Sequence, residues 1–77
     1  MVEFSENVLI DLGFKNCRVR NYGETAKIEV LSDELEKLLN PSIRNQIIND
    51  FKKIGFLYVT IDLEGYQSGR LNRSVGV

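Results

Sequence analysis

The stretch Cys17-Arg18-Val19-Arg20-Asn21-Tyr22-Gly23-Glu24-Thr25-Ala26-Lys27-Ile28-Glu29-Val30 contains two alternating segments on either side of a glycine. Alternation with period two is typical of strands that bury one face, and glycine accepts the positive φ that tight turns require. The stretch therefore predicts a β-hairpin with its turn at residues 21–24. Its apolar face carries Cys17, Val19, Ala26, Ile28 and Val30, and its polar face carries Arg18, Arg20, Lys27 and Glu29.

The polar face of this hairpin combines three cations with a single carboxylate. Guanidinium groups form paired hydrogen bonds with carboxylate and phosphate oxygens, so a rigid sheet that presents them is suited to binding an anion. The alternative is the ordinary solvated side of a half-covered sheet. Periodicity alone does not separate these two interpretations.

Three apolar stripes at helical spacing lie outside the hairpin. The first covers residues 2–12 and ends at Gly13, and the second covers residues 32–39 with Ser32 as its cap. The third begins at Asn40-Pro41, where proline needs no N–H, and ends at Gly55. The residues expected to face the core are Phe4, Val8, Leu9 and Leu12; Leu35, Leu38 and Leu39; and Ile43, Ile47, Ile48, Phe51 and Ile54.

Residues 56–63 predict a third strand, because β-branched and aromatic residues alternate there. Its aliphatic side chains, which are expected to face the helices, are Leu57, Val59, Ile61 and Leu63. The opposite side carries Phe56, Tyr58, Thr60 and Asp62. The polar face then extends over three strands, which strengthens the interpretation as a binding site and leaves simple solvation as the alternative.

The element order helix-strand-strand-helix-helix-strand predicts an α+β fold, a small three-stranded and mainly antiparallel sheet with helices on one face. The third strand could lie beside the first, in the order 2-1-3 and antiparallel throughout. Alternatively, a right-handed crossover could pair the second and third strands in parallel. We expect residues 1–63 to form a single domain and residues 64–77 a C-terminal tail, which is either a loose end or anchored to the domain by Tyr66 and Leu71.

Composition limits the classes of function. The 77 residues carry a net charge of -1, without the basic excess of a general nucleic-acid-binding protein, and no apolar run is long enough for a membrane span. The lack of histidine and the single cysteine argue against a soft-metal site and exclude an internal disulfide, so we expect a reducing cytoplasm. Cys17, on the apolar face, is interpreted as a small core residue.

Two blocks of the sequence resemble a known family. The first comprises Gly13-Phe14, Arg18-Val19-Arg20, Gly23 and Ala26-Lys27-Ile28-Glu29-Val30, and the second runs from Gly55 to Gly69 with Asn72 beyond it. In order and spacing, these blocks resemble the C-terminal domain of the ATP-dependent sacrificial sulfur transferases. Those enzymes are PP-loop ATP-pyrophosphatases of nickel-pincer nucleotide cofactor synthesis.

Members of that family adenylate a carboxylate of a pyridinium dicarboxylate mononucleotide and then transfer sulfur from their own cysteine. The resemblance implies that Arg18 and Arg20 hold an anionic phosphate or carboxylate group. It also implies that Glu29 and Glu6 are acidic residues of the same site. The further candidates are Lys27, Tyr58, Thr60 and Asp62. No catalytic residue and no metal ligand is predicted.

The chain departs from the family at several points. It lacks the Ser-Gly-Gly-x-Asp-Ser loop and the sacrificial cysteine, so we expect no catalysis by the chain alone. ATP and magnesium are expected only with a PP-loop ATP-binding domain or protein as partner. Lys27 replaces the usual arginine, Tyr22 the usual histidine, and Arg70 a small residue.

The expected function is therefore binding of a mononucleotide-type anionic substrate, or assembly with the PP-loop partner or into a homo-oligomer. No membrane or nucleic-acid partner is expected. The alternative is a small protein–protein interaction or dimerisation module without a small-molecule site.

Overall fold

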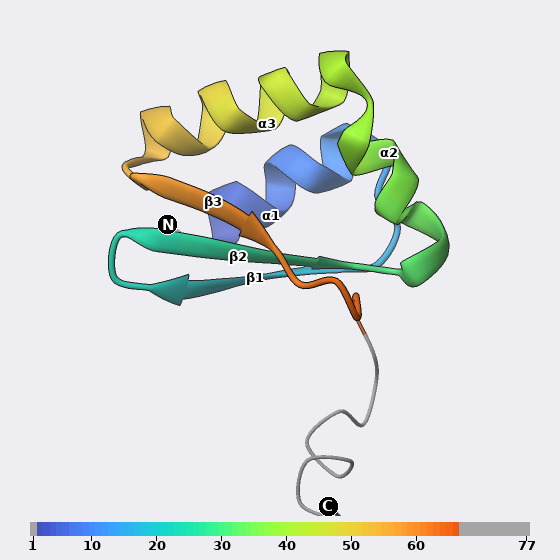
Figure 1. The fold of residues 1–77 in the computed structure, drawn as a ribbon. Coiled ribbons are helices and arrows are strands. Elements are labelled where there is room, and N and C mark those ends of the chain that lie inside the picture. Colours follow the sequence, from blue (N-terminus) through green and yellow to red (C-terminus); the bar gives the residue numbers. More distant parts are fainter. Residues whose placement is uncertain (1, 67–77) are drawn as a thin grey trace, which may run out of the picture.

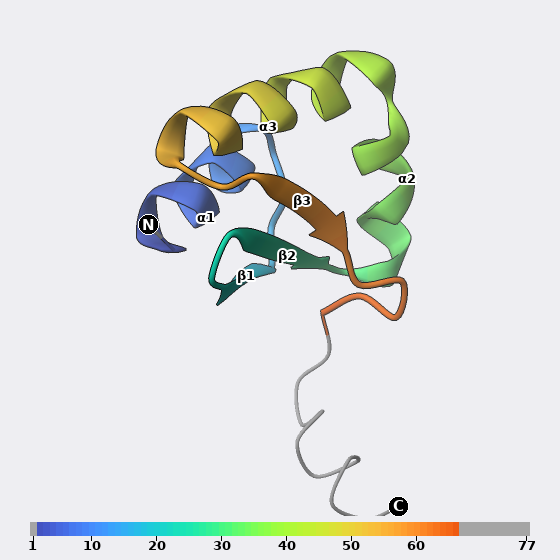
Figure 2. The same ribbon diagram turned by 60° about the vertical axis from the view of Figure 1, so that its left-hand side comes forward.

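The computed structural model describes residues 2–66 and places the helices on one side of a three-stranded sheet (Figures 1 and 2). This arrangement confirms the α+β class and the coverage of one sheet face. The elements in chain order are α1 (Val2–Asp11), β1 (Cys17–Tyr22), β2 (Thr25–Val30), the 3₁₀ helix η1 (Ser32–Glu34), α2 (Leu35–Leu39), α3 (Pro41–Ile54) and β3 (Tyr58–Ile61).

The sheet has the strand order β1-β2-β3. β1 and β2 are antiparallel, and β2 and β3 are parallel, with Thr25 opposite Tyr58. The sheet is therefore mixed, and the 2-1-3 order is wrong. The helical crossover returns the chain beside β2, as the handedness rule allows, while α1 occupies the outer edge of β1. There the carboxylate of Glu6 accepts a hydrogen bond from the backbone N–H of Val19 at 3.0 Å.

The hairpin turn is shorter than the sequence predicts. Tyr22 pairs with Thr25, which leaves only Gly23 and Glu24 between the two strands. Gly23 has a φ of 66°, the left-handed value that glycine adopts at little cost. This tight turn fixes the register and so decides which side chains of β1 and β2 lie next to one another.

The ends of α3 agree with the sequence. The side-chain oxygen of Asn40 accepts hydrogen bonds from the backbone N–H groups of Ser42 and Ile43, and Pro41 is the first helical residue. Gly55, with a φ of 127°, follows the last turn. The cap predicted at Ser32 is wrong, because Leu31 precedes η1 there and no side chain caps the helix.

The core lies between the helices and the sheet. Its buried apolar residues are Leu9, Phe14, Val19, Ala26, Ile28, Val30, Leu38, Ile47, Phe51 and Phe56. The rings of Phe51 and Phe56 have centroids 5.9 Å apart. Phe56 was expected to face away from the helices. It is buried instead, because it lies in the connection between α3 and β3, before the strand alternation begins.

Four residues predicted to face the core are exposed: Phe4, Leu39, Leu57 and Leu63. Each lies near the end of an element or beyond it, where no second element covers it. The covered side of α1 runs instead through Ser5 and Leu9, both fully buried. Within residues 2–66, no helix combines the length and apolar character needed to cross a membrane.

The first residues of the predicted tail contact the end of β2. The backbone N–H of Tyr66 donates a hydrogen bond to the carbonyl of Val30 at 2.6 Å, and Gly65 is buried. Tyr66 therefore anchors the start of this segment, which is the alternative to a loose end that the sequence left open. The second predicted anchor, Leu71, and the rest of the tail at 67–77 lie outside the described residues.

Candidate functional site

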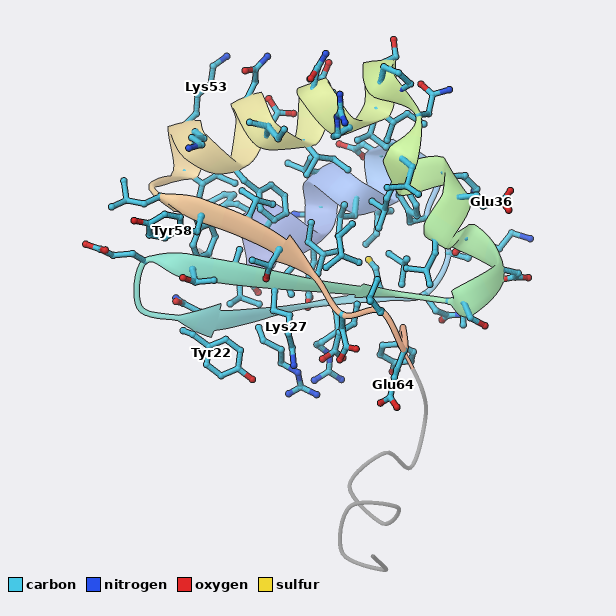
Figure 3. The ribbon with its side chains drawn as sticks, in the orientation of Figure 1. Tyr22, Lys27, Glu36, Lys53, Tyr58 and Glu64 are labelled. Carbon is cyan, nitrogen blue, oxygen red and sulfur yellow. The ribbon has the colours of Figure 1, made fainter. Side chains whose placement is uncertain are left out.

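The open-face cluster, defined as Arg18, Arg20, Lys27, Glu29 and Asp62, lies on the side of the sheet away from the helices. Figure 3 shows Lys27 projecting from that side. The register pairs Arg18 with Glu29 and Arg20 with Lys27 across β1 and β2. Asp62 follows directly after β3, which lies beside β2. The hairpin thus brings both predicted arginines next to the predicted carboxylate.

Glu29 is the centre of this cluster and is only 3% exposed. Its Oε2 lies 3.5 Å from Nε of Arg20 and 3.6 Å from Nζ of Lys27. Lys27 also lies 3.6 Å from Oδ2 of Asp62. Burial of a carboxylate is costly without partners, and these two cations supply them. The side chains of Arg20 and Lys27 are 43% and 32% exposed, so both still reach solvent.

Two tyrosine rings contact cations of the cluster. The guanidinium of Arg18 lies 5.9 Å from the ring centroid of Tyr66, and the ammonium of Lys27 lies 5.6 Å from that of Tyr22. Such cation–π contacts orient a cation and leave its hydrogen-bond donors available at the sides. The contact of Tyr22 with Lys27 was not predicted. The period-two pattern of Arg18 and Arg20, continued by two residues, would have placed Tyr22 on the same face.

Glu6, the second acidic residue expected at the site, lies elsewhere. Its carboxylate bonds the outer edge of β1 at Val19, between α1 and the sheet. Among residues 2–66 it forms no ion pair with either arginine. The structure therefore does not bring Glu6 into the open-face cluster.

The three candidates around β3 differ in their contacts. Asp62 contacts the cluster through Lys27 and also accepts a hydrogen bond from the backbone N–H of Glu64. The hydroxyl of Thr60 donates to the carbonyl of Ala26 at 2.9 Å, so it strengthens the pairing of β2 and β3. Tyr58 is 60% exposed at the start of β3. Of these three side chains, Asp62 is the one with an ion pair to Lys27 among the described residues, and Thr60 lies opposite Lys27 in the register of β2 and β3.

Cys17 is half-buried and packs against the core. Burial raises the pKa of its thiol, and the charges of Glu6 and Glu34 raise it further. The thiol is therefore protonated at neutral pH and is a poor nucleophile. This environment agrees with the interpretation of Cys17 as a small core residue.

The charges of the cluster determine what it can do chemically. Three cations face two carboxylates, which leaves an excess of one positive charge. An anion that enters must share Arg20 and Lys27 with Glu29, whereas Arg18 has no carboxylate partner among the described residues. The arrangement is suited to holding and orienting a small anionic group.

Comparison with known proteins gives a relation over most of the chain. No protein-family model matches. An uncharacterized protein of Synechocystis sp. is 41% identical over 69 residues, which make up 90% of this chain and 26% of that protein. Pyridinium-3,5-bisthiocarboxylic acid mononucleotide synthase of Lactiplantibacillus plantarum is 35% identical over 68 residues, or 88% of this chain and 24% of the synthase.

The chain is similar to one part of this synthase. It spans about a quarter of the length of the curated relatives it matches. The similarity supports the relation to the sulfur transferase family that the two sequence blocks indicate.

Proposed function

We propose that this chain acts as a substrate-binding and assembly domain of a protein related to pyridinium-3,5-bisthiocarboxylic acid mononucleotide synthase. In this proposal, which also places the chain at the C-terminal end of such a protein, the open-face cluster binds a phosphate or carboxylate group of a mononucleotide-type substrate. The similarity to the synthase over 88% of the chain supports the relation. The observation that carries the binding role is the set of three cations beside the buried carboxylate of Glu29.

Arg18 makes the first contact with the anion in this proposal. Its guanidinium is held over the ring of Tyr66, and its planar fork matches the two oxygens of a carboxylate or phosphate. Arg20 and Lys27 then complete the site from the neighbouring positions. Glu29 keeps these two cations in place when the site is empty and limits the affinity when an anion enters.

The chemical steps belong to the partner. A PP-loop domain or protein would supply the ATP-binding loop and magnesium, and the sacrificial cysteine would lie outside this chain. We therefore expect the purified 77-residue protein to convert no ATP to AMP. Turnover that persists in a preparation free of other proteins would contradict this division of roles.

Amide chemical shifts test the binding site directly. The labelled protein is titrated with inorganic phosphate and then with nicotinic acid mononucleotide, and shifts are expected at Arg18, Arg20 and Glu29. The variant Arg18→Ala should bind roughly 10- to 100-fold more weakly, because a hydrogen-bonded charge contributes roughly 1.5–3 kcal/mol.

The matched control is Lys53→Ala, which removes one positive charge from the helical side of the molecule (Figure 3). It should bind both anions as the parent chain does. Equal weakening by the two variants would mean that net charge alone attracts the anion. The absence of shifts at millimolar ligand would remove the proposed site from this chain.

A further inference from the structure

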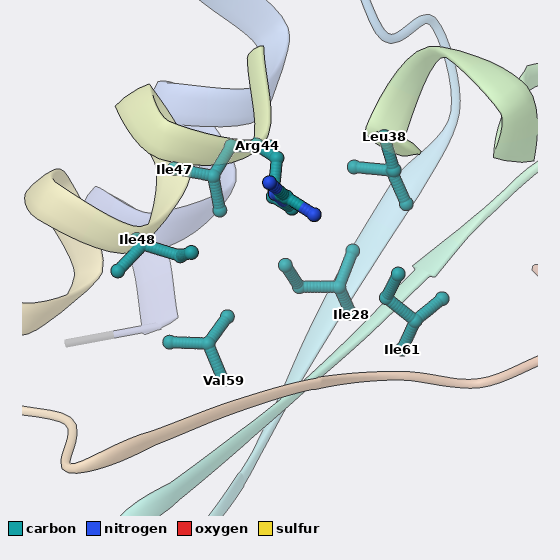
Figure 4. A pocket seen from close by; sticks show the side chains of 7 residues that line it. All are labelled: Ile28, Leu38, Arg44, Ile47, Ile48, Val59 and Ile61. Atoms are coloured by element: carbon teal, nitrogen blue, oxygen red, sulfur yellow. The ribbon is translucent and has the colours of Figure 1, made fainter. Parts of the chain in front are cut away.

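A hollow of about 150 Å³ lies on the helical side of the sheet, away from the open-face cluster (Figure 4). It opens between α2, α3 and the strands β2 and β3. Its apolar lining consists of Ile28, Leu38, Ile47, Ile48, Val59 and Ile61. The one charged residue at its wall is Arg44, whose side chain makes no hydrogen bond or ion pair with any other described residue.

The rim of the hollow belongs to α3. Arg44, Ile48 and Lys52 follow one another at intervals of four residues, so they form one row along the helix. A second, wider and more open depression of about 340 Å³ shares Ile48 and Val59 with the first. Its other lining residues are Lys52, Leu57, Tyr58 and Thr60. The two depressions adjoin at Ile48 and Val59, and together they are called the apolar groove beside β3. Arg44 lies near one end, and Lys52, whose ammonium donates a hydrogen bond to the carbonyl of Leu57 at 2.9 Å, lies near the other.

β3 forms the edge of the sheet along this groove. The backbone N–H groups of Tyr58 and Asp62 donate hydrogen bonds to the carbonyls of Glu24, in the hairpin turn, and Ile28, in β2. Because alternate residues of a parallel strand point to opposite sides, the backbone groups of Val59 and Ile61 point to the outer edge. No other strand of the described part of the chain lies there. Unpaired edges of this kind bind extended peptide segments.

The shape of the groove and the charges at its rim indicate which kind of molecule could bind there. The first hollow has about the volume of one large apolar side chain, and the second depression continues it along the strand edge, a shape that suits an extended segment better than a compact molecule. A second copy that docks through the same edge, as in a two-fold dimer, would place Arg44 and Lys52 against the same two cations. The segment 67–77 contains Arg70 and Arg73 and no acidic residue. Like charges therefore disfavour both of these occupants.

We propose that the β3 edge binds an extended, acidic segment of another polypeptide. One apolar side chain of that segment fills the hollow beside Ile48 and Val59. Acidic residues two positions before and after it lie on the same side of the strand, because side chains alternate, and they pair with Arg44 and Lys52. Backbone hydrogen bonds to Val59 and Ile61 hold the segment at the edge.

A synthetic peptide tests this pattern. The probe is acetyl-Thr-Glu-Thr-Leu-Thr-Glu-Thr-amide, whose symmetric order suits either strand direction. Its addition to the labelled protein should shift the amides of Val59 and Ile61 and the signals of Ile48. Arg44→Ala should weaken binding roughly fivefold, as expected for one partly exposed ion pair. Lys53→Ala, on the same helix but outside the row, should leave the affinity unchanged.

Three control peptides define the result further. Replacement of both glutamates by lysine should abolish the shifts, and so should replacement of the leucine by threonine. N-methylation of the three central residues removes backbone donors and should weaken binding if the peptide adds as a strand. Equal binding of the lysine peptide, or shifts confined to the open-face cluster, would overturn the proposal.

Analytical ultracentrifugation of the protein without peptide tests whether a second copy of the chain binds at the β3 edge, because it measures the oligomeric state. Self-association that Arg44→Ala alters and that protects the amides of Val59 and Ile61 would overturn the acidic-segment proposal. A monomer is the expected result. The apolar hollow and the open-face cluster lie on opposite sides of the sheet. The two proposals can therefore fail separately: a protein that does not bind the peptide can still bind the anion, and a protein that does not bind the anion can still bind the peptide.

Discussion

Replacement of Glu29 by glutamine removes the charge at the centre of the open-face cluster and keeps its shape. Arg20 and Lys27 then lose a carboxylate at 3.5 and 3.6 Å. At an effective dielectric constant of about 20, each direct attraction amounts to roughly 4–5 kcal/mol. Most of this is offset, because the cost of burying the carboxylate disappears and the half-exposed cations regain hydration. We expect a net loss of about 2 kcal/mol in the free energy of unfolding.

Urea denaturation followed by circular dichroism measures this loss. In a domain of this size it corresponds to a decrease in Tm of roughly 8–16 °C. The matched control is Glu24→Gln, which removes an exposed carboxylate at the hairpin turn and should change stability by no more than about 0.5 kcal/mol. If Glu29→Gln is no more destabilising than this control, the carboxylate does not hold the cluster together.

The same variant should bind phosphate more tightly while it unfolds more easily. Glu29 competes with an incoming anion for Arg20 and Lys27, and relief of about 1 kcal/mol would increase the affinity roughly fivefold. Isothermal titration at low salt gives the affinity. A parallel loss of stability and affinity would mean that Glu29 supports the anion site only by keeping the domain folded.

Three further predictions concern the scaffold. Asn40→Ala should cost about 1 kcal/mol of stability through loss of the α3 cap, and Asn40→Asp should retain it, as urea denaturation would show. Gly23→Ala should cost about 1–2 kcal/mol because of its positive φ, whereas Gly65→Ala should cost roughly 1–3 kcal/mol more, because its Cβ would lie 2.6 Å from the carbonyl oxygen of Val30. Burial and two nearby carboxylates raise the pKa of the Cys17 thiol, so the unfolded chain loses this proton first as the pH rises. Stability should therefore decline above about pH 8.5, the ordinary thiol value, and Cys17→Ala should remove this decline in Tm measured from pH 7 to 10.

Local signals predicted much of the secondary structure. The range of α3 follows from Asn40, Pro41 and Gly55, whose backbone preferences act within a few residues of each helix end. The hairpin follows from alternation and Gly23 for the same reason. These features depend on the chain itself, so the sequence alone was sufficient to find them.

The strand order depends on packing between distant segments. Both positions of β3 satisfied the connection rules, and the choice follows from the edge of β1 that α1 and Glu6 occupy. Whether an apolar side chain is buried or exposed also depends on segments that are distant in the sequence. The helical stripe includes Phe4 as well as Leu9, but only Leu9 has a second element packed over it.

The membership of the open-face cluster was predictable, whereas the burial of Glu29 was not. Alternation places Arg18, Arg20, Lys27 and Glu29 on one face whatever covers it. Glu29 is buried where the longer side chains of Arg20 and Lys27 meet its carboxylate, a packing of neighbouring side chains that alternation does not predict. The anion-binding role of these residues remains a proposal for the titrations to test.

The mixed sheet also implies an order of folding. β1 and β2 are joined by a two-residue turn, whereas β3 can reach β2 only after the whole helical crossover has been placed. Early loop closure favours the hairpin, and the parallel pair must form late. In native-state hydrogen exchange, the amides that bond β3 to β2 should therefore open at a lower free energy than those within the hairpin. The strand that borders the apolar groove would be the last to join the native structure and the first to leave it.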